Sequence, residues 1–271
     1  MTAVGAMPLP RRRATVTFAL DGRVQAAAFL VALIGLQEVL TRTGILPSGY
    51  FPPASEIAAA LAGELGGPAL GPAVSSTVVT WLSALSISVV LGTVAGIVLG
   101  LFAPVEALLR PVIEFLRPVP SVALIPLVVL TIGTGSQSAL FLAVFAAFWQ
   151  VLVPAIAGVR AAHPVALETA RSYHLTAWQR IRWIQLPSML PYLATAIRLA
   201  TSTTLILVVT AEIIIQMPGI GYEITMARSA GNPARMYAYI ALSGLAGIAL
   251  NALMRRVERR ALAAQGPEEI R

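Results

Sequence analysis

Six long apolar runs, separated by short polar connections, are the feature of this chain that most restricts its fold. A helix needs about 20 apolar residues to cross about 30 Å of hydrocarbon, and in lipid it satisfies all of its own backbone hydrogen bonds. The runs spread evenly over 271 residues and leave no soluble segment of domain size. We therefore expect an all-α, polytopic membrane protein. The six expected spans are 24–41, 74–102, 112–134, 138–159, 191–216 and 236–254.

The distribution of charge predicts how these spans are oriented. Only 11% of the residues are charged, whereas a soluble domain has about a quarter. Six spans place both termini on one side of the membrane. If that side is the cytoplasm, only Arg42, Arg228 and Arg235 of the 19 basic residues lie outside, as the positive-inside rule favours. We therefore expect a membrane domain of residues 24–260 between two cytoplasmic tails, 1–23 and 261–271.

Residue types that the sequence lacks exclude several functions. The chain contains no lysine and no cysteine. A P-loop needs its lysine to reach the β- and γ-phosphates of ATP, so this polypeptide is not expected to be its own ATPase. Without cysteine there is no thiolate nucleophile and no sulfur ligand for a metal. We therefore expect no catalytic residue, no metal site and no cofactor in this chain.

Prolines and turn residues mark two irregular regions. Pro118, Pro120 and Pro126 interrupt the third expected span, so we expect it to be short or kinked. Outside the membrane, residues 45–65 read as a turn followed by a short helix, which Ser55 can cap.

The longest cytoplasmic connection, residues 160–190, has the pattern of two short helices. Pro164 suits the first position of a helix that is expected to run for about ten residues. Thr176, with a glutamine three residues later, forms a capping-box pattern, and the helix that it starts is expected to end near Pro187. Two packed helices make a rigid projection, which transmits a push from a soluble partner better than a flexible loop does.

This connection resembles the EAA loop of binding-protein-dependent ABC importer permeases. In that family E-A-A is followed after three residues by a glycine, and I-x-L-P precedes the next span. Here Glu168-Thr169-Ala170 stands at the first position, His174 at the glycine, and Ile184-Gln185-Leu186-Pro187 at the close. The thirteen-residue distance from His174 to Pro187 matches the family spacing.

The resemblance continues outside the loop and covers most of residues 45–260. The segment RPVIEFLRPVPSVALIPLVVLTIGTG (Arg110–Gly135) is similar to a stretch of nitrate, sulfonate and taurine permeases. LPSGYFPPASEIAAAL, the Ala211-Glu212 pair and Val257-Glu258-Arg259-Arg260 are similar to the same subfamily. The resemblance therefore implies a type I ABC importer permease fold with a cytoplasmic coupling helix, in the bacterial inner (plasma) membrane.

Roles for the matched loop residues follow from the resemblance. It implies that Glu168, Thr169 and Ala170 lie on the coupling helix, which docks into a groove of an ATPase, and that Arg171 and Tyr173 flank the contact. The remaining matched loop positions are His174, Leu186 and Pro187. A histidine at the glycine position is strained if the backbone there is left-handed, so the corner can be angled differently from that of the family.

Partners follow from the resemblance as well. It implies two permease copies in a homodimer, two P-loop ATPase subunits that bind ATP and Mg, and an extracytoplasmic solute-binding protein. The ATPases close when they bind ATP, and the membrane bundle then changes from inward-facing to outward-facing. The favoured substrate is a small anion of the sulfonate, taurine or nitrate kind.

Polar residues inside the expected spans are candidates for the translocation pathway. Glu212 follows about twenty largely apolar residues of the fifth span, where an acidic group is costly and often functional. For an anionic substrate it must be neutral or paired, since a bare carboxylate repels an anion. Gln216 lies one turn further on, and Trp149 and Gln150 are candidates in the fourth span. Whether Glu212 faces the pathway or has a structural role is left open.

A stripe of small residues marks the second span. Gly92, Gly96 and Gly100 recur every four residues, which aligns them on one helical face. Such a face lets another backbone approach closely, so we expect helix packing there. A hinge or a pore-lining surface is the alternative.

Two other classes of function compete with the importer. In an ion-gradient-driven secondary transporter, Glu212 would be the coupling carboxylate, but the helical projection of residues 160–190 would then have no role. An intramembrane enzyme finds no support, because the sequence has no G-x-S-x-G or H-E-x-x-H motif.

Overall fold

The computed structural model describes residues 22–263, which fall into two compact units divided between Ala54 and Ser55. The side chains that it describes are those of residues 24–260. The expected tails, 1–23 and 261–271, therefore lie outside the described residues apart from a few backbone positions at their inner ends.

The first unit consists of helix α1 (Gly22–Arg42) and the segment that follows it to Ala54. Most side chains on α1 are apolar and exposed, as a membrane-spanning helix requires. At its end Glu38 pairs with Arg42 at 2.6 Å, and the side-chain amide of Gln37 donates to the carbonyl of Pro52 at 3.2 Å.

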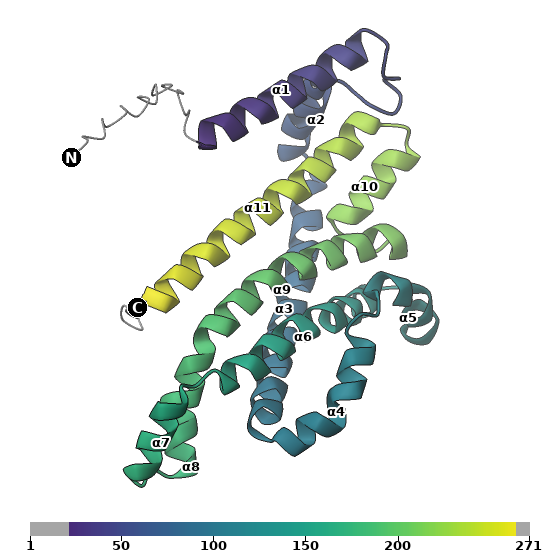
Figure 1. Ribbon diagram of the computed structural model, residues 1–271. Helices are drawn as coiled ribbons and strands as arrows, with labels where there is room; N and C mark the ends of the chain where they lie inside the picture. The colour runs from purple at the N-terminus through teal and green to yellow at the C-terminus, as the bar shows by residue number, and fades with distance from the viewer. Residues whose placement is uncertain (1–21, 264–271) are drawn as a thin grey trace, which may run out of the picture. The chain divides into compact units, whose positions relative to one another are not determined.

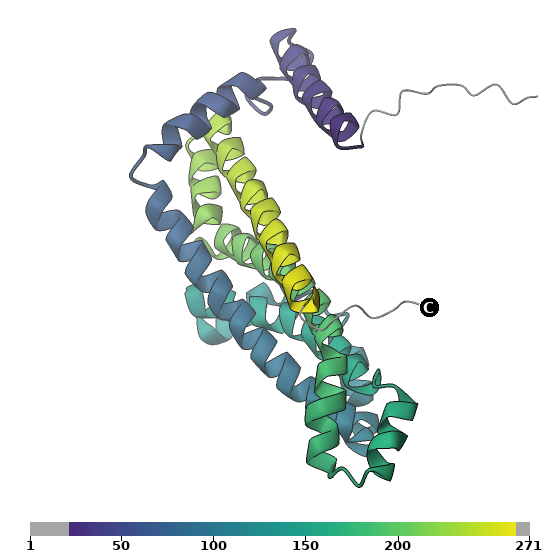
Figure 2. The ribbon, with the colours of Figure 1, turned by 90° about the vertical axis from the view of Figure 1, so that its left-hand side faces the viewer.

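The second unit contains the remaining helices (Figures 1 and 2). They are α2 (Ala54–Leu65), α3 (Leu70–Leu101), α4 (Ala103–Leu116), the 3-10 turn η1 (Ser121–Leu124), α5 (Ile125–Ile132), α6 (Ser136–Arg160), α7 (Pro164–Ser172), α8 (Ala177–Arg180), the π-helical turn η2 (Ile181–Gln185), α9 (Leu186–Ile215), α10 (Ile220–Ser229) and α11 (Pro233–Ala263). No described residue is in a β-strand, which confirms the expected all-α class.

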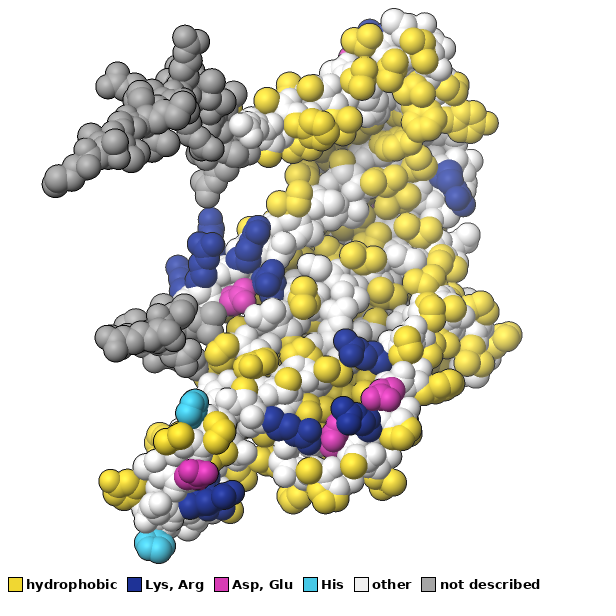
Figure 3. Space-filling view, in the orientation of Figure 1, with side chains coloured by type: hydrophobic (Ala, Val, Ile, Leu, Met, Phe, Trp, Pro, Cys, Tyr) yellow, Lys and Arg dark blue, Asp and Glu magenta, His cyan; other side chains and the backbone are white. Residues whose placement is uncertain are grey.

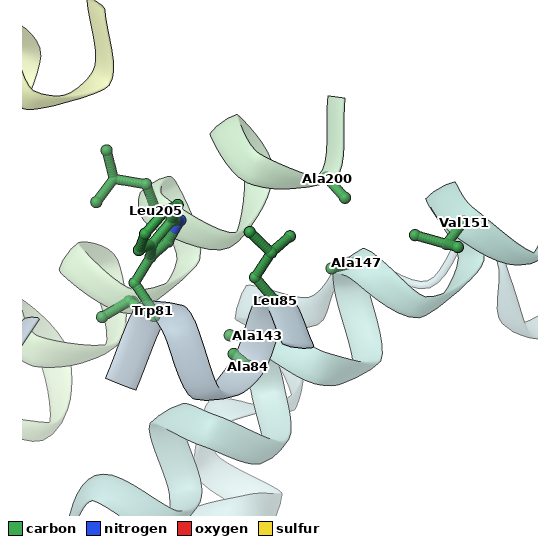
Figure 4. Packing of buried hydrophobic residues seen from close by; sticks show 9 residues of the cluster. Trp81, Ala84, Leu85, Ala143, Ala147, Val151, Ala200 and Leu205 are labelled. Carbon is green, nitrogen blue, oxygen red and sulfur yellow. The ribbon is translucent and has the colours of Figure 1, made fainter. Parts of the chain in front are cut away.

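Helix α6 packs along both α3 and α9 to form the centre of this unit. Figure 4 shows Trp81, Leu85 and Leu205 beside much smaller side chains of the same cluster. Ala84, Ala143, Ala147 and Ala200 are fully buried there. Lipid tails are as apolar as leucine, so helices in a membrane associate through close packing of small residues rather than through exclusion of water.

The glycine stripe lies in the α3–α6 contact. A methyl group added at Gly92 would meet the Val151 side chain at 2.8 Å, and one at Gly100 would meet Val159 at 2.7 Å. One added at Gly96 would overlap the Cβ of Ala155. The stripe therefore allows α3 and α6 to approach more closely than any larger side chain permits.

The third expected span, 112–134, is not one continuous helix. Helix α4 ends at Leu116, and the segment from Ser121 to Ile132 is bent away from it by 81°. Pro118 and Pro120 lie in this break, where the missing N–H groups prevent a continuous helical ladder. Five described helices are long and apolar enough to cross a membrane alone, and six spans result if the bent pair counts as one.

Two further differences from the sequence analysis lie near the fifth span. The helix that begins after Thr176 does not end near Pro187, because α8, η2 and α9 form one path of 39 residues from Ala177 to Ile215. The π-helical turn ends at Gln185 and changes the hydrogen-bonding register, so Pro187 lies in the first turn of α9, where a residue without an N–H is tolerated. The short helix α10 after Gln216 was not expected.

Candidate functional site

Helix α7 begins at a well-formed cap. His163, the residue before it, has extended backbone angles, and its Nδ1 accepts a hydrogen bond from the backbone N–H of Val165 at 3.3 Å. Pro164 fills the first helical position, where no N–H is needed.

The turn after α7 is closed by backbone hydrogen bonds. The N–H of Leu175 donates to the carbonyl of Ala170, and the N–H of His174 donates to that of Arg171, both at 2.9 Å. His174 has φ +57°, the left-handed conformation that glycine usually supplies at this position. Histidine therefore occupies the glycine position of the motif without abolishing the turn, although a residue with a Cβ strains the backbone there.

A second cap follows within two residues and begins α8. The hydroxyl of Thr176 accepts from the N–H of Gln179 at 3.3 Å, and the Gln179 side chain accepts from the N–H of Thr176 at 2.8 Å. These reciprocal bonds are the capping box that the sequence predicts. The two helices and the turn between them thus form a projection with defined ends, which we call the coupling projection (residues 163–187).

The outer face of the coupling projection is exposed. Glu168, Thr169 and Arg171 all point into solvent, and Tyr173 is 77% exposed. Ala170 is 5% exposed and faces inward. Neither Glu168 nor Arg171 has an ion-pair partner among the described residues, so both remain available to a partner. Figure 3 shows acidic, basic and histidine side chains on the surface at the end of the molecule where α7 and α8 lie.

The base of the projection is tied to the membrane helices. Leu186 packs against the cluster of Ala155, Val159 and Met189, while Pro187 is exposed. At the other end of the connection, the guanidinium of Arg160, the last residue of α6, donates to the carbonyl of Gly100 at 3.2 Å and pairs with Glu106 at 3.6 Å. Arg160 therefore joins the end of α6 to the end of α3, whose last carbonyls lack helical partners, and to α4.

Glu212 lies in the packed interior of the unit and is completely buried. Its Oε1 accepts a hydrogen bond from the hydroxyl of Thr77 at 2.7 Å, and its Oε2 accepts one from the N–H of Gly221 at 2.8 Å. The Thr77 hydroxyl in turn accepts from the N–H of Ile220 at 2.9 Å. Two of the first N–H groups of α10, which have no helical partner, are satisfied in this way. We call Thr77, Glu212 and residues 219–221 the α10 clamp.

Glycines make the α10 clamp possible. A Cβ at Gly219 would collide with the Glu212 carboxyl group, and one at Gly221 would collide with the carbonyl of Val209. Thr77 is 135 positions from Glu212 and was not among the residues predicted from the sequence. The Gly219-Ile220-Gly221 pattern after Pro218 is the signal that could have indicated a helix start near the acidic residue.

The structure does not bring the four predicted pathway residues together. Helix α9 ends at Ile215, and Gln216 turns into the left-handed region at φ +58° and is exposed, so it does not share a face with Glu212. Gln150 donates from its side-chain amide to the hydroxyl of Thr203 on α9 at 2.8 Å. Trp149 makes edge contacts with Phe145 and Phe148. The predicted role of these residues in transport stays a prediction.

An ion-pair cluster holds α2, α10 and α11 together. Arg235 pairs with Glu64 at 2.8 Å and with Glu223 at 3.0 Å. The phenol of Tyr239 donates to the same Glu64 carboxylate at 2.6 Å. Since α2 buries none of its residues, this cluster is a principal attachment of that helix.

These features define a multi-pass α-helical membrane protein with a helical projection at one end. The family model of the binding-protein-dependent transport system inner membrane component matches residues 88–262, and the chain belongs to this family.

Individual relatives agree with that assignment. The chain is 34% identical over 179 residues to the taurine transport system permease protein TauC of Escherichia coli (strain K12), a match that covers 66% of this chain and 63% of the relative. It is 30% identical over 172 residues to the putative aliphatic sulfonates transport permease protein SsuC of Bacillus subtilis (strain 168), a match that covers 64% of this chain and 62% of the relative. The match thus spans less than two thirds of the length of either relative.

Solved structures share the fold. A chain of the MetNI methionine ABC transporter in an inward-facing conformation superposes with a TM-score of 0.63 at 18% identity, over 71% of this chain and 96% of that one. A chain of an amino acid ABC transporter structure superposes with a TM-score of 0.60 at 17% identity, over 69% of this chain and 92% of that one. These likenesses confirm the expected type I importer permease fold.

Proposed function

We propose that this chain is the membrane-spanning permease subunit of an ATP-driven importer. The observation that carries the proposal is the coupling projection, which is capped at the start of both helices and exposed on the face of Glu168 and Arg171. In this function the projection docks into a groove of a P-loop ATPase subunit, and the ATPase binds the ATP and Mg. The permease contributes no ATPase site.

The length of α8–η2–α9 supports a projection outside the membrane. Its 39 residues extend about 58 Å at about 1.5 Å per residue. The hydrocarbon layer is about 30 Å thick, so close to half of this path lies beyond it. A movement applied at the projection is carried into the bilayer by one continuous helical path.

The assembly follows from this role. Two copies of the chain enclose one pathway, two ATPase subunits bind on the side of the coupling projection, and an extracytoplasmic solute-binding protein delivers the substrate. Both termini and the projection lie in the cytoplasm. The substrate class is a small anion such as a sulfonate, taurine or nitrate, supported by relatives whose names state taurine, aliphatic sulfonates and nitrate.

The competing function is an ion-gradient-driven secondary transporter with Glu212 as its coupling carboxylate. Both oxygens of Glu212 already accept hydrogen bonds inside the α10 clamp. A structural role accounts for these contacts without an ion cycle.

Affinity purification of the tagged chain in mild detergent tests the proposal. We expect a P-loop ATPase to co-purify, and its ATP hydrolysis to change when the permease is present. A matched variant, Glu168→Arg, should lose the ATPase while the permease itself still purifies as a folded protein. A permease that co-purifies with no ATPase, and whose substrate uptake collapses with a protonophore but not with ATP depletion, would establish the secondary transporter instead.

A further inference from the structure

Helix α4 carries a row of charged residues along one side. Glu106, Arg110 and Glu114 follow one another at intervals of four residues, and Arg110 pairs with Glu114 at 3.2 Å and with Glu106 at 3.8 Å. Arg160, at the end of α6, pairs with Glu106 at 3.6 Å. Figure 3 shows basic and acidic side chains alternating along α4. The side chains of Arg110 and Glu114 are 66% and 70% exposed, so the row lies on the surface of the described chain.

Arg117 follows this row but is not paired with it. It lies three residues after Glu114, which places the two side chains on the same side of the helix. Arg117 is exposed, and its side chain has no hydrogen bond or ion pair within the part of the chain that the structure describes. The two glutamates of the row balance Arg110 and Arg160. Arg117 is therefore the charge that this side of α4 leaves uncompensated.

The other sides of α4 differ from the charged one. One side packs against α3 and α6 through the side chains that line the hollow between these helices, which are Val105, Leu109, Val112 and Ile113. A second side exposes two apolar side chains, Leu108 by 76% and Phe115 by 73%, as contact with lipid requires. At 3.6 residues per turn, the charged residues fall between these two sides. Helix α4 thus has a packed side, an apolar exposed side and a charged exposed side.

The course of α4 places Arg117 within the membrane layer. The helix starts after a single residue that follows α3, beside Arg160, and its 14 residues extend about 21 Å. The next segment brings α5 into one buried cluster with Ala139, in the first turn of α6, and Ile215, the last residue of α9. These residues lie at the end of the unit opposite the coupling projection. Arg117 therefore lies between the two ends of a layer about 30 Å thick, where a charged side chain faces water or protein rather than lipid.

We propose that the charged side of α4 lines a water-filled path, closed by the second copy of the proposed assembly, and that Arg117 holds the transported anion there. The inference rests on the proposed importer function and names the group that recognises its substrate. A guanidinium donates two parallel hydrogen bonds to an oxyanion such as a sulfonate, and it keeps its charge at physiological pH. The paired residues of the row make the wall polar, while the uncompensated Arg117 selects anions over cations.

Cysteine accessibility tests the path, because the chain has no native cysteine. Glu114→Cys on the charged side and Phe115→Cys on the apolar side are compared in lipid nanodiscs, in the complex as it purifies. The reagents are the anionic methanethiosulfonate ethylsulfonate and the cationic methanethiosulfonate ethyltrimethylammonium. Since charged reagents are excluded from hydrocarbon, we expect Glu114→Cys to react with both at least about tenfold faster than Phe115→Cys. Size-exclusion chromatography first establishes that each variant purifies as the wild type does.

The role of Arg117 is measured as a preference between the two reagents. A positive charge within one helical turn of the cysteine attracts the anionic reagent and repels the cationic one. Arg117→Gln in the Glu114→Cys protein should therefore lower the ratio of the anionic to the cationic reaction rate about tenfold. Arg259→Gln removes the same charge from an exposed position near the end of α11 and should leave the ratio unchanged.

Protection by a bound anion tests recognition itself. Uncharged methyl methanethiosulfonate modifies Glu114→Cys in the presence of ethanesulfonate, of nitrate, or of chloride at equal ionic strength. We expect ethanesulfonate or nitrate to slow the modification at least about twofold relative to chloride, as half occupancy of the site requires. The protection should vanish in Arg117→Gln and be partly retained in Arg117→Lys, which keeps the charge but not the planar fork.

Three results would overturn the inference. Equal reaction at positions 114 and 115 would place α4 at the surface of the membrane instead of along a path. An unchanged reagent ratio in Arg117→Gln, or an equal change in Arg259→Gln, would show that Arg117 has no local effect. Absence of protection by both anions would show that it holds none. Co-purification of the ATPase is measured separately, so a complex that keeps its ATPase and fails these tests would leave the importer function standing.

Discussion

Thr77 on α3 and Glu212 on α9 are joined by a hydrogen bond of 2.7 Å, although 135 positions separate them in the chain. Both side chains also contact the first residues of α10, through Ile220 and Gly221. One buried carboxylate and one hydroxyl therefore position three helices. This relationship gives Glu212 a structural role that explains an acidic group inside an apolar span.

Replacing Glu212 should destabilise the fold, and the loss of stability should increase with the number of its two hydrogen bonds that the new side chain removes. Glu212→Ala leaves the Thr77 hydroxyl and the Gly221 N–H buried without an acceptor, and we expect a loss of about 1–3 kcal/mol in the free energy of unfolding. Glu212→Gln keeps one acceptor oxygen and should lose less. Thermal unfolding in one fixed detergent and lipid mixture measures both. Equal melting temperatures for the wild type and Glu212→Ala would show that the clamp contributes no stability.

Substitution within the glycine stripe should separate α3 from α6. Gly96→Ala places a methyl group on the Cβ of Ala155 and should cost about 1–3 kcal/mol, as overpacking of a dense core does. Gly71→Ala is the matched control in the same helix, because nothing lies within 4 Å of the added methyl group. If the two variants unfold at the same temperature, the close α3–α6 approach is not needed.

Glycine at position 174 should stabilise the coupling projection. His174 has φ +57°, and a left-handed conformation costs a residue with a Cβ about 1–2 kcal/mol, part of which is offset by the greater chain entropy of glycine. We expect His174→Gly to gain up to about 1 kcal/mol. Tyr173→Gly, at a neighbour with φ −81°, should instead lose stability. Hydrogen exchange of residues 164–187 reports the effect locally, and a loss of protection in His174→Gly would contradict it.

The ion-pair cluster should determine how firmly α2 is held. Glu64→Gln removes the charge that pairs with Arg235 and weakens the acceptor of the Tyr239 hydroxyl, so α2 should exchange its amide hydrogens faster. Glu56→Gln changes the same residue type in the same helix at an exposed position with no ion-pair partner among the described residues, and should leave exchange unchanged. Identical exchange in both variants would mean that other contacts hold α2.

Local patterns predicted local structure well, and they failed where distant segments meet. The capping box at Thr176 depends on neighbouring residues, so their spacing alone predicted it. The left-handed conformation of His174 was indicated by its place at the glycine position of the EAA loop. The α10 clamp depends on a hydroxyl far away in the sequence and could not be inferred from one span. Hydropathy alone does not register a bend within the third span, but its prolines predicted a kink, which the 81° bend between α4 and the segment from Ser121 confirms.

The prediction that a helix ends near Pro187 is wrong. A proline commonly marks the end of a helix, but here a π-helical turn precedes it and α9 starts with it in the first turn. The result is a continuous path from the coupling projection into the membrane.

The central claim is that the coupling projection docks onto an ATPase, and site-directed cross-linking tests it most directly. The chain has no native cysteine, so Glu168→Cys introduces a single reactive position. We predict that it cross-links to a cysteine in the groove of the co-purified ATPase, with a yield that changes between nucleotide-free and ATP-bound states. Ser229→Cys, exposed at the end of α10, should not cross-link. The absence of any cross-link from position 168 in every nucleotide state, alongside normal transport, would contradict the account.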